Sequence, residues 1–219
     1  MKAKRLKSLL EPRKSIGWAV LALPVLLVVA SVLFSECSQL QASLSEYYHT
    51  RIRFAFVGML VLLALLLFRY RGYDRTDTWV QRASAVCVLL MALFPIDFSE
   101  TPVAPCHWVG SPRLPGSHAI HLAAGACFFL MMIYLVLFRF TRSDKRKDQL
   151  RKPKINRNRS YRLSGWVMAG CLVLIGCWYF GWNAAYPETL KYAPVFWLES
   201  TALWALGFAW LTKAKVFSR

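Results

Sequence analysis

The sequence predicts an all-α, polytopic membrane protein: a single domain built as a bundle of six transmembrane helices, with both termini in the cytoplasm. Three observations predict this fold class. First, 57 % of the 219 residues are hydrophobic, and the mean hydropathy is +0.37. Second, the apolar residues form long, nearly uncharged runs instead of the periodic stripes of a soluble core. Third, Lys and Arg are concentrated in the short segments between these runs, which is typical of multi-pass membrane proteins.

Six apolar runs give the expected helices, because each can cross a hydrocarbon core of about 30 Å at a rise of 1.5 Å per residue. They cover residues of about 16–34, 52–68, 80–96, 118–138, 163–182 and 192–211. The first run follows a basic segment, as a signal peptide does. It is too long for one, however, and Ser-Glu-Cys at 35–37 is not a small-residue cleavage site, so we expect an uncleaved helix. The third run needs its flanks to span, with Gln81 and Arg82 at the membrane interface beside Trp79.

The basic residues predict the orientation of the bundle. Of the 28 Lys and Arg residues, only Arg51, Arg53, Arg113 and Lys191 fall in segments that an arrangement with a cytoplasmic N-terminus places outside. Because cytoplasmic segments carry an excess of Lys and Arg, both termini are expected inside. The sequence therefore predicts a multi-pass protein of a bacterial inner (plasma) membrane.

The net charge of +17 is explained by this topology. The most basic segment, 139–162, is expected to be a solvated cytoplasmic loop that contacts the anionic lipids of the bilayer. A docking site for an acidic cytoplasmic partner is the alternative interpretation of that loop. A membrane protein is the other candidate partner of the chain. No DNA- or RNA-binding motif accompanies the charge, so nucleic acid is not an expected partner.

The residues that can carry chemistry gather on the predicted outer side, where all four histidines fall. His118 and His121 are three apart at the start of the fourth helix, so both imidazoles lie on one side of it. Together with His49 they could form a three-histidine zinc site with an open position for a reactive water. The alternative is that these histidines only form hydrogen bonds to loops and lipid headgroups.

Three further outer residues are candidate catalytic groups beside that zinc site. Ser45 and His49 are four apart, which places them on one face of a helix. Asp97 or Glu46 could act as general base or orient a zinc ligand.

An acidic residue, Glu199, lies about two turns inside the sixth expected helix. An unpaired acid at that depth costs a few kcal/mol, so it should face the bundle and pair with Arg51, Arg53 or a histidine. The two arginines could equally hold the anionic headgroup of a substrate. Glu199 is the third candidate substrate-binding residue. A purely structural ion pair, or a protonated and hydrogen-bonded carboxyl, is its alternative role.

Two of the six cysteines, Cys37 and Cys106, fall in predicted outer loops, where the compartment is oxidising. We expect a disulfide between them; metal ligation by Cys106 and His107 is the competing interpretation. The other four fall inside helices and are expected to be buried.

The segments 45–58, 70–74, 92–95, 121–129 and 196–199 together resemble a group of uncharacterised bacterial multi-helix membrane proteins, a domain of unknown function. This resemblance covers most of the chain after the first helix. It implies six helices and no particular activity.

A second resemblance rests on the order of Ser45 and His49, then Asp97, then His118 and His121. In this order the chain is similar to the membrane hydrolases that include alkaline ceramidases and adiponectin-type receptors. Those proteins carry a Ser and a His four apart, an Asp and a late HxxxH pair around zinc. Here the pair is HxxH on the fourth helix, and one helix is missing.

The function that these residues favour is a metal-dependent hydrolysis of lipid-like substrates from the outer side. The alternative is a non-catalytic subunit or scaffold of a larger membrane complex. A transporter is disfavoured because intramembrane charge is nearly confined to Glu199. A nucleotide-dependent enzyme is disfavoured because the chain has no glycine-rich phosphate loop.

Overall fold

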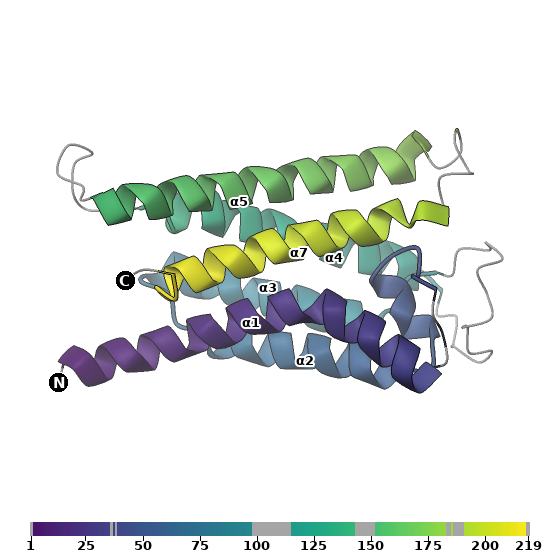
Figure 1. Ribbon diagram of the computed structural model, residues 1–219, viewed down its shortest axis with the longest axis horizontal. Helices are drawn as coiled ribbons and strands as arrows, with labels where there is room; N and C mark the ends of the chain where they lie inside the picture. The colour runs from purple at the N-terminus through teal and green to yellow at the C-terminus, as the bar shows by residue number, and fades with distance from the viewer. Residues whose placement is uncertain are drawn as a thin grey trace.

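Six long helices run lengthwise beside one another in the computed structural model of the chain, with both termini at one end (Figure 1). The structure describes residues 2–35, 37, 39–97, 115–142, 152–182, 185 and 191–217. The long helices are α1 (Lys2–Ser35), α2 (Arg53–Arg69), α3 (Arg75–Leu93), α4 (Ser117–Tyr134), α5 (Lys152–Cys177) and α7 (Pro194–Lys213). The short elements are the 3-10 helix η1 (Ser45–His49) and the π-helical turns η3 (Leu135–Arg139) and η5 (Trp178–Trp182). All regular structure in these described ranges is helical, which confirms the all-α prediction.

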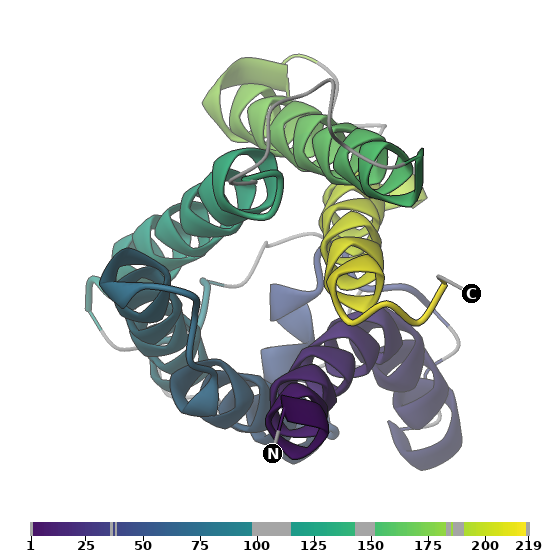
Figure 2. The ribbon, with the colours of Figure 1, turned by 90° about the vertical axis from the view of Figure 1, so that its left-hand side faces the viewer.

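The long helices form a closed ring in chain order. Each packs against its neighbours in the sequence, and α7 returns to pack against α1 (Figure 2). We call the end of the ring where α1 begins and α7 ends the termini end. The opposite end, which carries η1 and the described histidines, is the histidine end.

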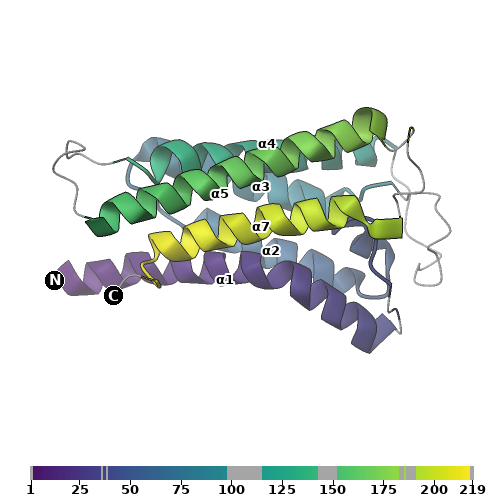
Figure 3. The ribbon, with the colours of Figure 1, turned by 45° about the horizontal axis from the view of Figure 1, so that its top comes forward.

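The contact between α1 and α7 closes the ring, and two glycines permit it. A β-carbon at Gly207 would lie 2.9 Å from the carbonyl oxygen of Gly17 and 2.6 Å from Cγ of Leu21. Because glycine has no side chain, the two backbones can approach more closely than other residues would allow. Pro24 removes a backbone hydrogen bond inside α1, and Figure 3 shows that this helix bends in its second half.

Four helices are long and apolar enough to cross a membrane. These spans are Glu11–Ser35, Ser117–Arg139, Ile155–Gly181 and Pro194–Lys213. Large apolar side chains point outward from the bundle, for example Phe34, 74 % exposed, and Phe180, 94 % exposed. A surface of this kind is suited to lipid, so the coarse prediction of a membrane protein is supported. α2 has only 17 residues, and α3 carries charged residues in its first turns.

The observed helices extend beyond the apolar runs at the termini end. α1 begins at Lys2 and α5 at Lys152, well before the expected positions of 16 and 163. Hydropathy detects the lipid-buried part of a helix and not its polar extension, which explains the difference. The helix expected at 80–96 is shifted and runs from Arg75 to Leu93.

The ends of α3 have identifiable causes. Asp74 is its N-cap, with the side chain accepting a hydrogen bond from the Asp77 amide at 2.9 Å. The helix stops before Phe94, because the residue that precedes Pro95 disfavours helical backbone angles. Gln81 is fully buried, so it faces the bundle and not the membrane interface as expected.

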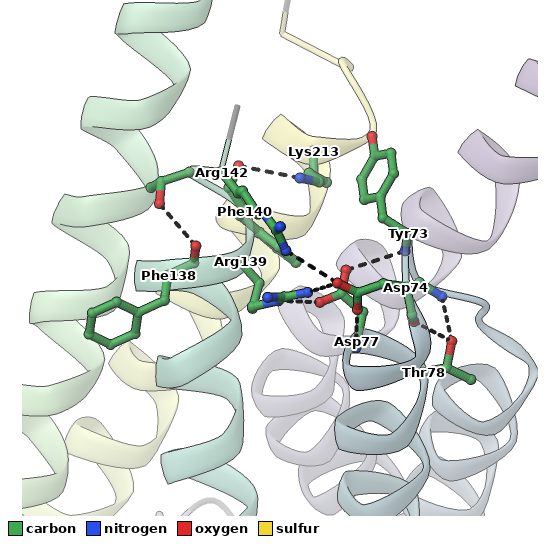
Figure 4. A network of polar contacts seen from close by, with 11 residues as sticks. Tyr73, Asp74, Asp77, Thr78, Phe138, Arg139, Phe140, Arg142 and Lys213 are labelled. Carbon is green, nitrogen blue, oxygen red and sulfur yellow. Dashed lines mark hydrogen bonds and ion pairs between the residues drawn. The ribbon is translucent and has the colours of Figure 1, made fainter. Parts of the chain in front are cut away.

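A polar network fastens α3 to the end of the α4–η3 helix at the termini end (Figure 4). Arg139 donates from Nε to Oδ1 of Asp77 at 2.5 Å and from Nη2 to Oδ2 of Asp74. Oδ2 of Asp77 accepts from the Tyr73 amide at 3.2 Å, and Arg142 reaches Asp74 at 3.3 Å. One guanidinium therefore bridges two carboxylates that α3 presents from its first turn.

Candidate functional site

The ring surrounds a partly open cavity of about 370 Å³, to which all six long helices contribute side chains. Most of its wall is aliphatic, aromatic or glycine. The polar side chains in the wall belong to Ser45, His121, Tyr179 and Glu199. We call this space the central cavity. An apolar pocket with a few convergent polar groups is the usual form of a small-molecule site.

Ser45 and His121 form a hydrogen-bonded pair in the wall of the central cavity. Oγ of Ser45 lies 2.8 Å from Nε2 of His121, and Nδ1 of His121 lies 2.8 Å from the carbonyl oxygen of Phe94. A carbonyl can only accept, so Nδ1 carries the proton and donates it to Phe94. In the neutral imidazole Nε2 is then unprotonated and accepts from the Ser45 hydroxyl. The tautomer is thus set by a backbone group just beyond the end of α3.

Glu199 is connected to this pair by a hydrogen bond to the backbone that precedes Ser45. Its Oε2 accepts a hydrogen bond from the Leu44 amide at 2.7 Å, and both residues line the cavity. One turn earlier on α7, the Phe196 amide donates to the Ala42 carbonyl at 3.0 Å. Residues 42–45 are therefore attached to α7 on one side and to α4 on the other. This attachment places a hydroxyl, an imidazole and a carboxyl around one end of the cavity.

The remaining described histidines hold the segment that follows α3. Nε2 of His49 donates to the Ile96 carbonyl at 2.6 Å, and Nδ1 of His118 accepts from the Asp97 amide at 3.1 Å. Oγ of Ser117 donates to the Pro95 carbonyl at 2.5 Å. These contacts fix the position of residues 94–97 and with it the Phe94 carbonyl that orients His121. His49 and His118 do not line the cavity.

The zinc site expected from His49, His118 and His121 is not assembled by this geometry. Among the described residues no group of three His, Cys, Asp or Glu side chains is placed to hold a metal ion. His118 uses its Nδ1 lone pair on a backbone amide, and both nitrogens of His121 are engaged. A ligand imidazole needs one unprotonated nitrogen directed at the metal. Zinc binding remains a prediction that no geometric feature of this region favours.

The carboxylates expected to act in catalysis have other surroundings. Glu46 accepts from the Ala42 amide at 3.2 Å, and its own amide donates to Oγ of Ser43 at 3.2 Å. This reciprocal arrangement resembles a capping box and stabilises the start of η1. Asp97 is exposed and lies 4.0 Å from Nδ1 of His118. Neither carboxylate lines the cavity.

The arginines expected near Glu199 do not pair with it among the described residues. Arg51 is exposed, and the guanidinium of Arg53 lies over the rings of Tyr48 and Phe54 at 5.6 and 5.4 Å. The carboxyl of Glu199 is instead held by a backbone amide. A role of the arginines in headgroup binding stays a prediction.

The cysteine predictions are tested only in part. Cys87, Cys127, Cys171 and Cys177 have free thiols, but Cys127 and Cys177 are exposed on the helix surface and not buried as expected. Cys106 and His107 lie outside the described residues, so the disulfide from Cys37 to Cys106 stays a prediction.

The sequence predicted Ser45 and His121 as residues of the site, but it did not predict that they form a pair with each other. The sequence prediction placed Ser45 and His49 on one face of an α-helix, whereas residues 45–49 form a 3-10 helix. In a 3-10 helix it is positions i and i+3 that eclipse, so residues four apart point in different directions. One feature of the sequence, the proline that follows Phe94, indicates that a helix ends there and leaves the Phe94 carbonyl available. No feature of the sequence indicates the central cavity.

Comparison with known proteins adds no relative: no family model, no curated protein and no solved structure matches this chain.

Proposed function

We propose that the chain is an integral membrane hydrolase that cleaves the acyl esters of lipid-like molecules, with Ser45 as nucleophile and His121 as general base. The observation that carries this proposal is the 2.8 Å hydrogen bond between Oγ of Ser45 and Nε2 of His121 in the wall of the central cavity. A nucleophile, a base within hydrogen-bond reach and a third group that orients the base are the diagnostic features of nucleophilic catalysis. Here the third group is the Phe94 carbonyl.

The chemistry follows from these positions. Oγ of Ser45 attacks the ester carbonyl carbon while its proton moves to Nε2 of His121. When the C–O bond to the alcohol breaks, Nε2 returns this proton to the leaving oxygen, and the acyl group remains on Ser45. Water then attacks the acyl carbon, giving its proton to Nε2, and the carboxylic acid leaves as Ser45 recovers its proton. Throughout, Nδ1–H of His121 donates to Phe94, which keeps the imidazole oriented.

The cavity supports an apolar acyl chain as the bound part of the substrate. Its volume of about 370 Å³ lies within the usual range of ligand pockets, and its wall is mostly hydrocarbon. Burial of each methylene contributes about 0.8 kcal/mol, so an alkyl chain would supply most of the binding free energy.

We further propose that all six long helices span the membrane and that the termini end is cytoplasmic. The support is the distribution of charge, since the described Lys and Arg residues lie mainly toward the termini end. The Ser45–His121 pair would then work near the outer surface of a bacterial inner membrane. In a background with all six cysteines replaced by serine, an impermeant maleimide should label Lys191→Cys in intact cells. It should label Lys215→Cys only after permeabilisation; the reverse result would overturn the orientation.

The decisive experiment for the activity is covalent labelling with a fluorophosphonate. An activated serine displaces fluoride and forms a stable P–O bond to the probe, so the purified wild type should be labelled on Ser45. Labelling should be lost in Ser45→Ala and strongly reduced in His121→Asn. The matched control is Ser200→Ala, because Ser200 is buried, its Oγ has no hydrogen-bond partner among the described residues, and it does not line the cavity.

Hydrolysis of p-nitrophenyl octanoate provides the second readout and separates the competing functions. Loss of hydrolysis in Ser45→Ala, unaffected by a zinc chelator, is the expected result. Loss on chelation, restored by added zinc, would replace the serine mechanism with the metal-dependent one. Absence of labelling and hydrolysis in a correctly folded wild type would refute the enzyme and leave the non-catalytic membrane subunit.

A further inference from the structure

Glu199 places a carboxyl group in the wall of a cavity that is otherwise mostly apolar. It lies on the second turn of α7, lines the central cavity and remains partly accessible. Its Oε2 accepts from the Leu44 amide. Within the described part of the chain, none of the ion pairs includes Glu199.

The energetics of this position favour a cationic ligand. A carboxylate inside a membrane protein is costly unless a positive group offsets its charge. One backbone amide satisfies one oxygen but supplies no full charge. The cavity can admit a ligand to the remaining side of the carboxyl, and an ammonium group there would pair with Glu199 where little water competes.

The location of Glu199 also constrains where that ammonium lies in the ligand. Glu199 is held by the amide of Leu44, and the next residue is the nucleophile Ser45. Consecutive residues are only about 3.8 Å apart. The amine and the reactive carbonyl of a substrate therefore lie near each other in the bound ligand.

We propose that the central cavity binds a single-chain amphiphile with a primary ammonium group close to its ester, and that Glu199 recognises this ammonium. The proposal names the substrate class of the site described above and so rests on the proposed function. The alkyl chain lies along the hydrocarbon wall, and the ammonium pairs with the carboxylate beside the Ser45–His121 pair. A neutral alcohol or a fatty acid anion of equal length gains no such pair and binds more weakly.

The chain offers a substitution that fills the cavity without disturbing its wall. A β-carbon at Gly176, which lines the cavity from α5, would meet nothing within 4 Å. Gly176→Leu should therefore fold normally and occupy the space of the alkyl chain. Gly170→Leu is the matched control, since Gly170 lies on the same helix, has equally open surroundings and does not line the cavity.

The test measures binding of radiolabelled dodecylamine to the full chain in phosphatidylcholine nanodiscs, with dodecan-1-ol and dodecanoate as competitors. Wild type should bind the amine, and neither competitor should displace it at equal concentration. Glu199→Gln should weaken binding about 30-fold or more, because the loss of one partner of a desolvated charge pair has an effect of this order. The glutamine oxygen can still accept from the Leu44 amide, so the fold should be preserved. Gly176→Leu should abolish binding and Gly170→Leu should not.

The outcomes separate this inference from the proposed function. The inference would be overturned if wild type and Glu199→Gln bound dodecylamine equally well. It would also be overturned if dodecan-1-ol displaced the radiolabelled dodecylamine as effectively as unlabelled dodecylamine does. In that event, labelling of Ser45 by the fluorophosphonate would still support the proposed hydrolase. Binding that depends on Glu199 and is unchanged in Ser45→Ala, combined with no labelling of Ser45, would refute the hydrolase and keep the amine site.

Discussion

Removal of Arg139 should destabilise the bundle far more than removal of the neighbouring Arg142. Arg139 is 14 % exposed and bridges Asp77, whose side chain is 10 % exposed, and Asp74. Arg139→Ala leaves the Asp77 carboxylate buried without a cation. Breaking a buried ion pair from one side costs 3–5 kcal/mol, and because this pair lies at the end of the bundle we expect about 3 kcal/mol.

Arg142→Ala removes the same charge from the same region but in a different setting. Its side chain is 62 % exposed, and it reaches Asp74, which is 40 % exposed, at 3.3 Å. Exposed pairs contribute little to stability, so the expected loss is much smaller than in Arg139→Ala. Arg139→Lys should lie between the two alanine variants, since one ammonium cannot bridge two carboxylates as the planar guanidinium does.

The assay is unfolding in mixed micelles by increasing SDS, followed by circular dichroism and tryptophan fluorescence. Adding Asp77→Asn to Arg139→Ala removes the unpaired charge and should recover part of the lost stability. Equal free energies of unfolding for Arg139→Ala and Arg142→Ala would refute the reasoning. A further loss in the double variant would refute it as well.

Three other predictions concern packing, pH dependence and covalent structure. Gly207→Ala should lower the free energy of unfolding by about 1–3 kcal/mol, because its methyl group would contact the α1 backbone. The same SDS titration measures this loss. The control is Gly58→Ala, which lies in open space on α2 and should be neutral or stabilising. The pKa of Asp74 is lowered by the hydrogen bond from the α3 backbone and by a guanidinium, so its carboxylate stabilises the fold above the unfolded-state pKa of about 3.9, and this contribution is lost as pH falls through the lower folded-state pKa. The Tm difference between wild type and Asp74→Asn should therefore be constant near neutral pH and shrink on acidification below about pH 4; a difference that persisted there would contradict the charge effect. The expected disulfide between Cys37 and Cys106 should give an intact mass that rises on reduction, and an unchanged mass would exclude it.

The candidate site combines side chains of the long helices with residues of the segments that connect them. The Phe94 carbonyl follows the end of α3, and Ser45 begins η1, and both form hydrogen bonds with one side chain of α4, His121. Because segment 94–97 is held by several histidine and serine contacts, a base oriented by a backbone carbonyl can remain well positioned. Loop positions fastened to rigid helices are a common location for catalytic groups.

Much of the fold could be predicted from the sequence, since burial of apolar runs in lipid depends on the order of residues alone. The number of helices and the location of four apolar spans follow from that order. Helix ends were less accurate where a helix continues into a basic segment, as at Lys152, because polar helical residues leave no hydropathy signal. The end at Leu93 is set by a following proline, a local signal that the apolar pattern obscured.

The sequence by itself determined that the chain is all-helical and apolar enough for a membrane, and it selected Ser45, His121 and Glu199 as residues of interest. Only the tertiary structure decided which of them meet. Ser45 and His121 are 76 residues apart, and Glu199 is 155 residues from the amide that holds it. Such pairings depend on the order of helices in the ring and on the rotation of each helix about its axis. These are set by packing among all six helices at once, as in the close approach of α1 and α7, and no local pattern of residues encodes them.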